Sequence, residues 1–121
     1  MTIRGVRGAT VAIENSAQAI LTATKDLLIA ISEANPGLKS TDIASVFFTV
    51  TDDLTQAYPA MAARQMGWTL VPLMCAREIP VVDSLSKCIR VLILWNTDLS
   101  QTDIHHIYLG DAKSLRPDFP G

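Results

Sequence analysis

The chain of 121 residues is long enough for one domain with a true hydrophobic core, and we expect residues 1–121 to form that single domain. Its net charge is −2 and it has no Lys/Arg cluster, which argues against nucleic acid or an anionic membrane as a partner. Hydrophobic residues make up 49% and charged residues 18%, a high apolar share for a small monomer. The composition therefore predicts a homo-oligomer in which a partner subunit covers apolar surface.

No segment approaches the roughly 18 to 20 apolar residues of a membrane span, and no basic-then-apolar signal segment opens the chain. We therefore expect a cytoplasmic protein. Cys75 and Cys88 lack the spacing of zinc ligands, so we expect no metal site and, in a reducing compartment, free thiols.

The first predicted element is a strand over residues 2–11, whose alternation places Arg7 on one face with Gly5 and Ala9. Small residues beside an arginine suit the close approach of a ligand. The spacing favours a β-bulge at Gly5 or Gly8 instead, and we expect the bulge.

A long helix follows. Asn15 and Gln18 resemble a capping box at its start, and Asn35-Pro36-Gly37 should stop it, because Pro36 disfavours a helical conformation in the residue before it. Apolar residues at helical spacing predict the buried stripe. This stripe consists of Ile20, Leu21, Thr24, Leu27, Leu28 and Ile31.

Shorter elements occupy the middle of the chain. We expect a helical turn near Thr41, a strand over residues 44–51, and a second helix from about Pro59 to Gly67. A strand is predicted over residues 68–75, and Pro72 keeps it away from the sheet centre because proline has no backbone donor.

The segment 87–95 is the strongest strand signal, and its apolar residues predict a strand buried on both faces. Arg90 lies in it, on one side with Cys88, Leu92 and Leu94. An unpaired buried charge costs several kcal/mol, so an anion must meet this guanidinium. That anion is either a carboxylate of the protein or a ligand.

The last elements are a helical turn over residues 100–103 and a strand over residues 104–109. His105 and His106 are neighbours in that strand and point to opposite sides, so they cannot bind one metal ion together. The tail from Leu115 to Gly121 should be extended and mobile.

The sequence lacks a phosphate loop, a recognisable nucleophile with its base, and a close carboxylate pair. Arginines on apolar strands remain, with a glutamate, a thiol and a tyrosine. Because arginine binds carboxylates with two parallel hydrogen bonds, this set favours a small polyanionic ligand. Such a site can catalyse by fixing a conformation and stabilising charge on an oxygen.

Several segments, taken together and in order, resemble the small AroH-type chorismate mutases over nearly the whole chain. The segments that carry the resemblance are Ile3-Arg4-Gly5-Val6-Arg7-Gly8-Ala9-Thr10, Tyr58-Pro59-Ala60, Gly67-Trp68, Val71-Pro72, Cys75-x-x-Glu78, Lys87-Cys88-Ile89-Arg90-Val91, Asn96-Thr97-Asp98, His106-Ile107-Tyr108-Leu109 and Leu115-Arg116-Pro117.

The resemblance implies conversion of chorismate to prephenate by a Claisen rearrangement in tyrosine and phenylalanine biosynthesis, without cofactor or metal. It also implies an α+β fold, with a mixed sheet and helices on one face. Three such chains would form a trimer with a barrel-like sheet core and active sites at the subunit interfaces.

Site roles are carried over from the resemblance. Arg90 would contact the ether oxygen and a carboxylate of the substrate, as the main catalytic group. Arg7 and Tyr108 would hold carboxylates, and Glu78 with Cys75 would meet the ring hydroxyl. The remaining expected pocket residues are Tyr58, Arg64, Met74, Leu115 and Arg116.

Two residues depart from the family pattern: Met61 stands where a lysine is frequent, and Met74 where a threonine commonly precedes the cysteine.

The sequence leaves two other functions open. One is a non-catalytic trimeric protein that binds a carboxylate metabolite, against which Glu78 argues. The other is an imine deaminase of a similar trimeric fold, against which the segments around Cys75 and Arg90 argue.

Overall fold

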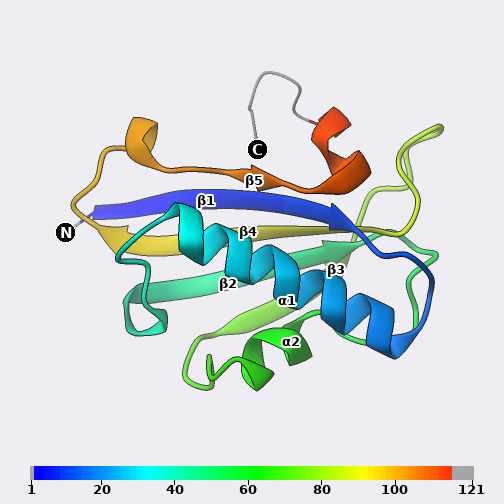
Figure 1. The fold of residues 1–121 in the computed structure, drawn as a ribbon, viewed down its shortest axis with the longest axis horizontal. Helices are drawn as coiled ribbons and strands as arrows, with labels where there is room; N and C mark the ends of the chain where they lie inside the picture. Colours follow the sequence, from blue (N-terminus) through cyan, green and yellow to red (C-terminus); the bar gives the residue numbers. More distant parts are fainter. Residues whose placement is uncertain (1, 116–121) are drawn as a thin grey trace.

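The computed structural model describes residues 2–115, which form one five-stranded sheet in the order β3-β2-β4-β1-β5. The long helix α1 crosses one face of this sheet (Figure 1). β4 pairs antiparallel with β1 and β2, whereas β3 and β5 are added in parallel at the two edges. The elements are β1 (Thr2–Val11), α1 (Ala17–Ala34), η1 (Ser40–Asp42), β2 (Ile43–Val50), α2 (Ala60–Gln65), β3 (Leu73–Arg77), β4 (Cys88–Thr97), η2 (Gln101–Asp103), β5 (Ile107–Tyr108) and η3 (Gly110–Leu115).

The main core lies between the sheet and the two α-helices. Buried side chains of α1 and α2 share one apolar cluster with side chains of β1, β2 and β4. Representative members are Leu28, Ala63, Val6, Phe48 and Val91. This arrangement confirms the α+β class and the mixed sheet. Within residues 2–115, no helix has the length and apolar character needed to cross a membrane.

Helix α1 does not begin with the predicted capping box. The hydroxyl of Ser16 accepts a hydrogen bond from the Ala19 N–H at 3.1 Å, so Ser16 is the N-cap. Asn15 instead exchanges two hydrogen bonds of 3.0 Å with Thr55, which tie the start of α1 to the loop before α2. The predicted stop is confirmed, because α1 ends at Ala34 and the Asn35 backbone N–H closes its last turn.

Two strands are shorter than predicted. β3 covers Leu73–Arg77 and not residues 68–75, because Trp68 donates its backbone N–H to the Ala63 carbonyl and closes the end of α2. Its place at the sheet edge agrees with the prediction from Pro72. β5 contains only Ile107 and Tyr108, since the Arg7 N–H is bound by the His106 side chain and not by a backbone carbonyl.

A short 3₁₀ helix, η3, follows β5 and was not predicted. Its Ala112 packs against Ala9 and Tyr108, forming a small buried cluster separate from the main core. Leu115 is its last residue and lies against this cluster. The predicted extended tail, residues 116–121, lies outside the described residues.

The predicted β-bulge at Gly5 or Gly8 is wrong. β1 and β4 pair without a register shift from Thr2 opposite Thr97 to Val11 opposite Cys88. Gly8 is buried directly beneath α1, where a Cβ atom would clash with Ile31. The glycine therefore allows the helix to approach the strand closely.

The face of the sheet opposite the α-helices is largely open. Arg90, Leu92 and Phe47 lie on it and are exposed, while the intervening Val91 is buried in the main core. The prediction that residues 87–95 are buried on both faces is therefore wrong for the single chain. Apolar residues indicate that a face is covered, but do not indicate whether the chain or a partner covers it.

Candidate active site

The open face of the sheet carries a row of paired residues centred on Arg90. Arg90 in β4 is opposite Ala9 in β1 and opposite Thr49 in β2. Ala9 is in turn opposite Tyr108 in β5. Because residues paired in register point to the same side of a sheet, these side chains share the open face.

A pocket of about 390 Å³ lies over this row. It brings together five of the ten residues predicted for the site: Arg7, Glu78, Arg90, Tyr108 and Leu115. Its other lining residues are Gly8, Phe47, Thr49, Val91 and Leu92. The pocket thus combines two guanidinium groups, one carboxylate and one phenol with apolar walls.

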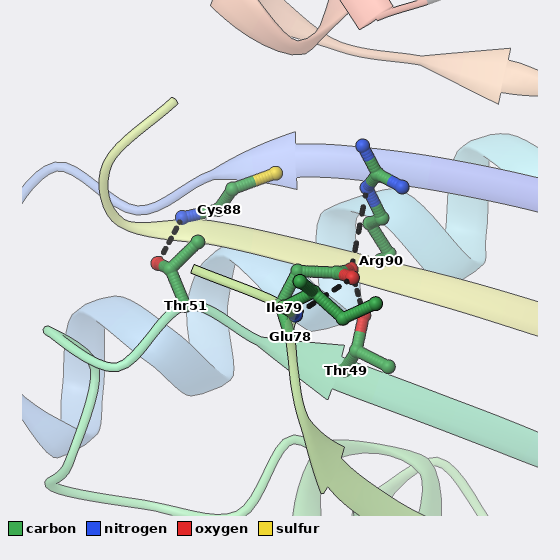
Figure 2. Close-up of polar contacts among 6 residues, drawn as sticks. All are labelled: Thr49, Thr51, Glu78, Ile79, Cys88 and Arg90. Atoms are coloured by element: carbon green, nitrogen blue, oxygen red, sulfur yellow. Dashed lines mark hydrogen bonds and ion pairs between the residues drawn. The ribbon is translucent and has the colours of Figure 1, made fainter. Parts of the chain in front are cut away.

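Glu78 is the internal partner of Arg90. One oxygen of its carboxylate, Oε2, lies 3.5 Å from Arg90 Nε and accepts a hydrogen bond of 2.8 Å from Thr49 Oγ1 (Figure 2). The other oxygen, Oε1, accepts the Ile79 N–H at 3.2 Å. The Arg90 side chain remains 47% exposed, and its terminal nitrogens point away from Glu78 (Figure 2). The carboxylate therefore meets one side of the guanidinium and leaves the other available to a ligand.

Cys88 lies on the same side of β4 as Arg90, as predicted. Its thiol is buried, and this burial raises its pKa, while the positive charge of the nearby Arg90 guanidinium acts in the opposite direction. The Cys88 N–H donates to Thr51 Oγ1 at 3.0 Å, which fixes the start of β4 next to the end of β2 (Figure 2).

Strand β4 is held at its start by a second contact. Lys87 has a left-handed backbone with φ of 51°, an unfavourable conformation for this residue type. Its N–H donates to both oxygens of the Asp53 carboxylate, at 2.9 and 3.1 Å. This role of Asp53 was not predicted from the sequence. An aspartate directly after a strand is a general turn signal and does not name its partner.

Arg7 and Tyr108 are held by the junction of β1 and β5. The Arg7 N–H donates to His106 Nδ1 at 2.9 Å, and the Leu109 N–H donates to the Ala9 carbonyl at 2.9 Å. Tyr108 is 5% exposed, between Ala9 and η3. The junction therefore seats a nearly buried phenol beside the arginine pocket.

Within residues 2–115, the other residues predicted for the site do not line this pocket. Cys75 is opposite Phe48, on the face covered by helices, and it lines a second hollow of about 750 Å³ with Tyr58 and Met61. Burial raises the pKa of the Cys75 thiol, whereas the nearby backbone of Ala60 and the charge of Arg64 lower it.

Met74 lines neither the Arg90 pocket nor the Cys75 hollow. It is opposite Phe47 on the open face of the edge strand, and it is exposed. Arg116 is outside the described residues. Of the lining residues that sequence reasoning missed, Thr49 is the polar one, because only the pairing of β2 with β3 and β4 places it beside Glu78 and Arg90. In residues 2–115, no group of three or more His, Cys, Asp or Glu side chains is gathered as metal ligands would be.

The fold and the pocket define a mixed-sheet protein with a pocket that two arginines, a glutamate and a tyrosine line. The family model for chorismate mutase type I matches residues 3–119. Among the relatives, chorismate mutase AroH of Thermus thermophilus is 52% identical over 96% of this chain and 95% of its own length. Chorismate mutase AroH of Bacillus subtilis (strain 168) is 42% identical over 98% of this chain and 93% of its own length.

A solved structure of a chorismate mutase has a similar fold. The chorismate mutase from Clostridium thermocellum Cth-682 superposes with a TM-score of 0.88 at 51% identity, over 91% of this chain and 97% of that one. The chain belongs to the type I chorismate mutases, a family of isomerases. Family membership favours the catalytic interpretation over the two alternatives raised from the sequence.

Proposed function

We propose that the pocket around Arg90 is where this chorismate mutase converts chorismate to prephenate. Chorismate carries two carboxylates, an enol-ether oxygen and a ring hydroxyl. The observation that supports the proposal is the placement of Arg7, Arg90, Glu78 and Tyr108 around one pocket of about 390 Å³. These groups offer two cations and a phenol for the carboxylates and the ether oxygen, and one acceptor for the hydroxyl.

In this proposal Arg90 stabilises the transition state. The C–O bond of the substrate breaks ahead of C–C bond formation, so negative charge develops on the ether oxygen. The terminal nitrogens of Arg90, which point away from Glu78, donate to that oxygen. Loss of one such donor typically costs roughly 3 to 4 kcal/mol, or about two to three orders of magnitude in rate.

The other pocket residues fix the reactive shape of the substrate. Arg7 and Tyr108 bind the carboxylates and hold the flexible enolpyruvyl arm over the ring, while Glu78 accepts a hydrogen bond from the ring hydroxyl. Holding the two reacting ends together lowers the activation barrier, because the bound substrate has already lost the conformational entropy that the free substrate would lose on reaching the transition state. The rearrangement transfers no proton to the protein, so the proposed mechanism uses no acid, base, cofactor or metal.

We further propose that three chains assemble so that each pocket is completed by a neighbour, in a trimer with a barrel-like sheet core. Two observations support this assembly. Phe47, Leu92 and Met74 expose apolar surface on the helix-free face beside the pocket. The hollow containing Cys75 and Tyr58 is on the other face of the same chain, so those two residues would serve the pocket of another subunit. Arg64, whose charge acts on Cys75, would join them there, and the trimer would work in the cytoplasm.

Chorismate consumption tests the proposed reaction. The purified protein should remove the absorbance of added chorismate, and Arg90→Ala should lose nearly all of that activity. Arg4→Ala is the matched control. Arg4 is another arginine of the sheet, on β1 opposite Trp95 in β4, but its side chain donates to the Leu99 carbonyl outside the pocket. Unchanged chorismate with the wild type, or full activity of Arg90→Ala, would refute the proposal. A solution mass of one chain in an active sample would refute the trimer.

A further inference from the structure

We propose that Thr49 is a positioning residue that holds the Glu78 carboxylate beside Arg90. The inference rests on the proposed function of the pocket and goes beyond it, because Thr49 has no place in the substrate contacts described above. Its evidence is the arrangement of three side chains from three segments: Thr49 on β2, Arg90 on β4, and Glu78 just after β3 (Figure 2).

The pairing of the strands sets this arrangement. Thr49 is opposite Arg90 in the antiparallel pair of β2 and β4, so both side chains rise from the same face at the same level. Glu78 follows the last residue of β3, and its own N–H still pairs with the Val50 carbonyl at 2.8 Å. The Glu78 backbone is therefore fixed next to Thr49, whereas these backbone contacts do not determine the rotamer of its long side chain.

The hydroxyl of Thr49 determines that direction. It donates to Glu78 Oε2 at 2.8 Å, and the same oxygen lies 3.5 Å from Arg90 Nε. A direct charge-assisted hydrogen bond between guanidinium and carboxylate is shorter, about 2.7 to 2.9 Å. The Thr49 hydroxyl thus binds the carboxylate more closely than the arginine does.

This difference matters for a site that must receive an anion. If Glu78 closed fully onto Arg90, it would occupy the donors needed by the substrate. If it turned to solvent, the pocket would lose its acceptor for the ring hydroxyl. The side chain of Glu78 is 25% exposed, so both movements are open to it. With Thr49 on Oε2 and the Ile79 N–H on Oε1, each oxygen has a fixed donor that is not Arg90.

The test compares one substitution that removes the hydroxyl of Thr49 with one that keeps it. Thr49→Val keeps the shape and the strand preference of threonine but removes the hydroxyl, whereas Thr49→Ser keeps the hydroxyl. We expect Thr49→Val to lower kcat/KM for chorismate about tenfold, as the loss of a hydrogen bond to a charged group does, and Thr49→Ser to stay within about threefold of the wild type.

A double-mutant cycle with Glu78→Ala then separates action through Glu78 from a general effect on the strand. Because Thr49 acts through Glu78, Thr49→Val should cause less than about a twofold further loss in the Glu78→Ala background. A full tenfold loss in that background would overturn the inference, as would equal losses for Thr49→Val and Thr49→Ser. Wild-type activity of Glu78→Ala would overturn it as well.

The proposed function is judged separately. Wild-type turnover of chorismate that is lost in Arg90→Ala and kept in Arg4→Ala supports the reaction in this pocket, whatever the cycle shows. Thermal unfolding of every variant at the same chain concentration identifies any substitution that disturbs the fold. If Thr49→Val proved unstable, the coupling would be measured with Thr49→Ala in the same cycle.

Discussion

Replacing Gly8 by alanine should test how closely α1 packs on the sheet. A Cβ atom at Gly8 would lie 2.7 Å from Ile31 Cδ1, 3.1 Å from Val91 Cγ1 and 3.2 Å from the Ile107 carbonyl oxygen. Gly5 on the same strand is a matched control, since its Cβ would meet only Leu92 Cδ1, at an ordinary 3.5 Å. The two variants therefore add the same methyl group to one strand in crowded and uncrowded surroundings.

The magnitude follows from which neighbours can move. Ile31 Cδ1 is the flexible end of a side chain, but the side chain is fully buried, and the Ile107 carbonyl belongs to the strand paired with Gly8. Overpacking of this kind lowers the free energy of unfolding by about 1 to 3 kcal/mol. Replacing glycine by alanine raises it by about 0.4 to 1 kcal/mol, because alanine reduces the conformational entropy of the unfolded chain. We expect a net loss of about 1 to 2 kcal/mol for Gly8→Ala, which lowers Tm by roughly 5 °C.

Circular dichroism during heating, at one chain concentration, measures both variants, and the solution mass checks that their assembly is unchanged. Gly5→Ala should match the wild type or exceed it slightly. Gly8→Ala should also lose chorismate turnover, because a shift of β1 displaces the neighbouring Arg7. A Gly8→Ala protein at least as stable as Gly5→Ala would show that α1 is not seated on β1 as described.

Three further predictions concern single groups. Citrulline in place of Arg90 keeps the shape and donors but loses the charge, so kcat should fall about two to three orders of magnitude; near-normal turnover would show that charge is unimportant. Met61→Lys should lower KM for chorismate with little change in kcat, since it adds a cation at the rim of the hollow with Cys75, and an unchanged KM would contradict this. Burial raises the pKa of the Cys88 thiol above its ordinary 9.0, so the folded chain keeps this proton to higher pH than the unfolded chain, and stability falls as pH rises from about 9. Unfolding free energies between pH 8.5 and 10 should fall less steeply for Cys88→Ala, and equal slopes would count against the burial of this thiol.

The sequence predicted those elements whose signals are local. The apolar stripe of α1 and its stop at Asn35 depend on neighbours within a few turns. The stop is confirmed, and so is the stripe, except that Leu21 is only half-buried. The N-cap was misassigned because Asn15 and Ser16 are both good capping residues, and the contact of Asn15 with Thr55 lies 40 residues away. In the same way, the β-bulge was favoured from spacing alone, whereas the packing of Ile31 over Gly8 decides the geometry.

For the candidate site too, some residues could be named from the sequence, whereas contacts that depend on strand register could not. Arg7, Glu78, Arg90 and Tyr108 were named from the family resemblance, and the structure places them around one pocket. The contact of Thr49 with Glu78 could not be predicted, because it depends on the registers of β2 with both β3 and β4. The burial of the Arg90 face was predicted from the apolar pattern of residues 87–95, and this pattern does not distinguish a face covered within the chain from one left for a neighbour.

The position of β1 between β4 and β5 has a consequence for biosynthesis. The Arg7 N–H and His106 Nδ1 are separated by 99 residues, and β4 also follows β1 by most of the chain. On the ribosome, β1 therefore emerges long before either neighbour exists and stays unpaired until late in synthesis. Contacts of such long sequence separation fold slowly and leave strand edges exposed to association with other chains. We expect nascent chains that end before β4 to depend on chaperones, and the arginine pocket to form only when the last strand docks.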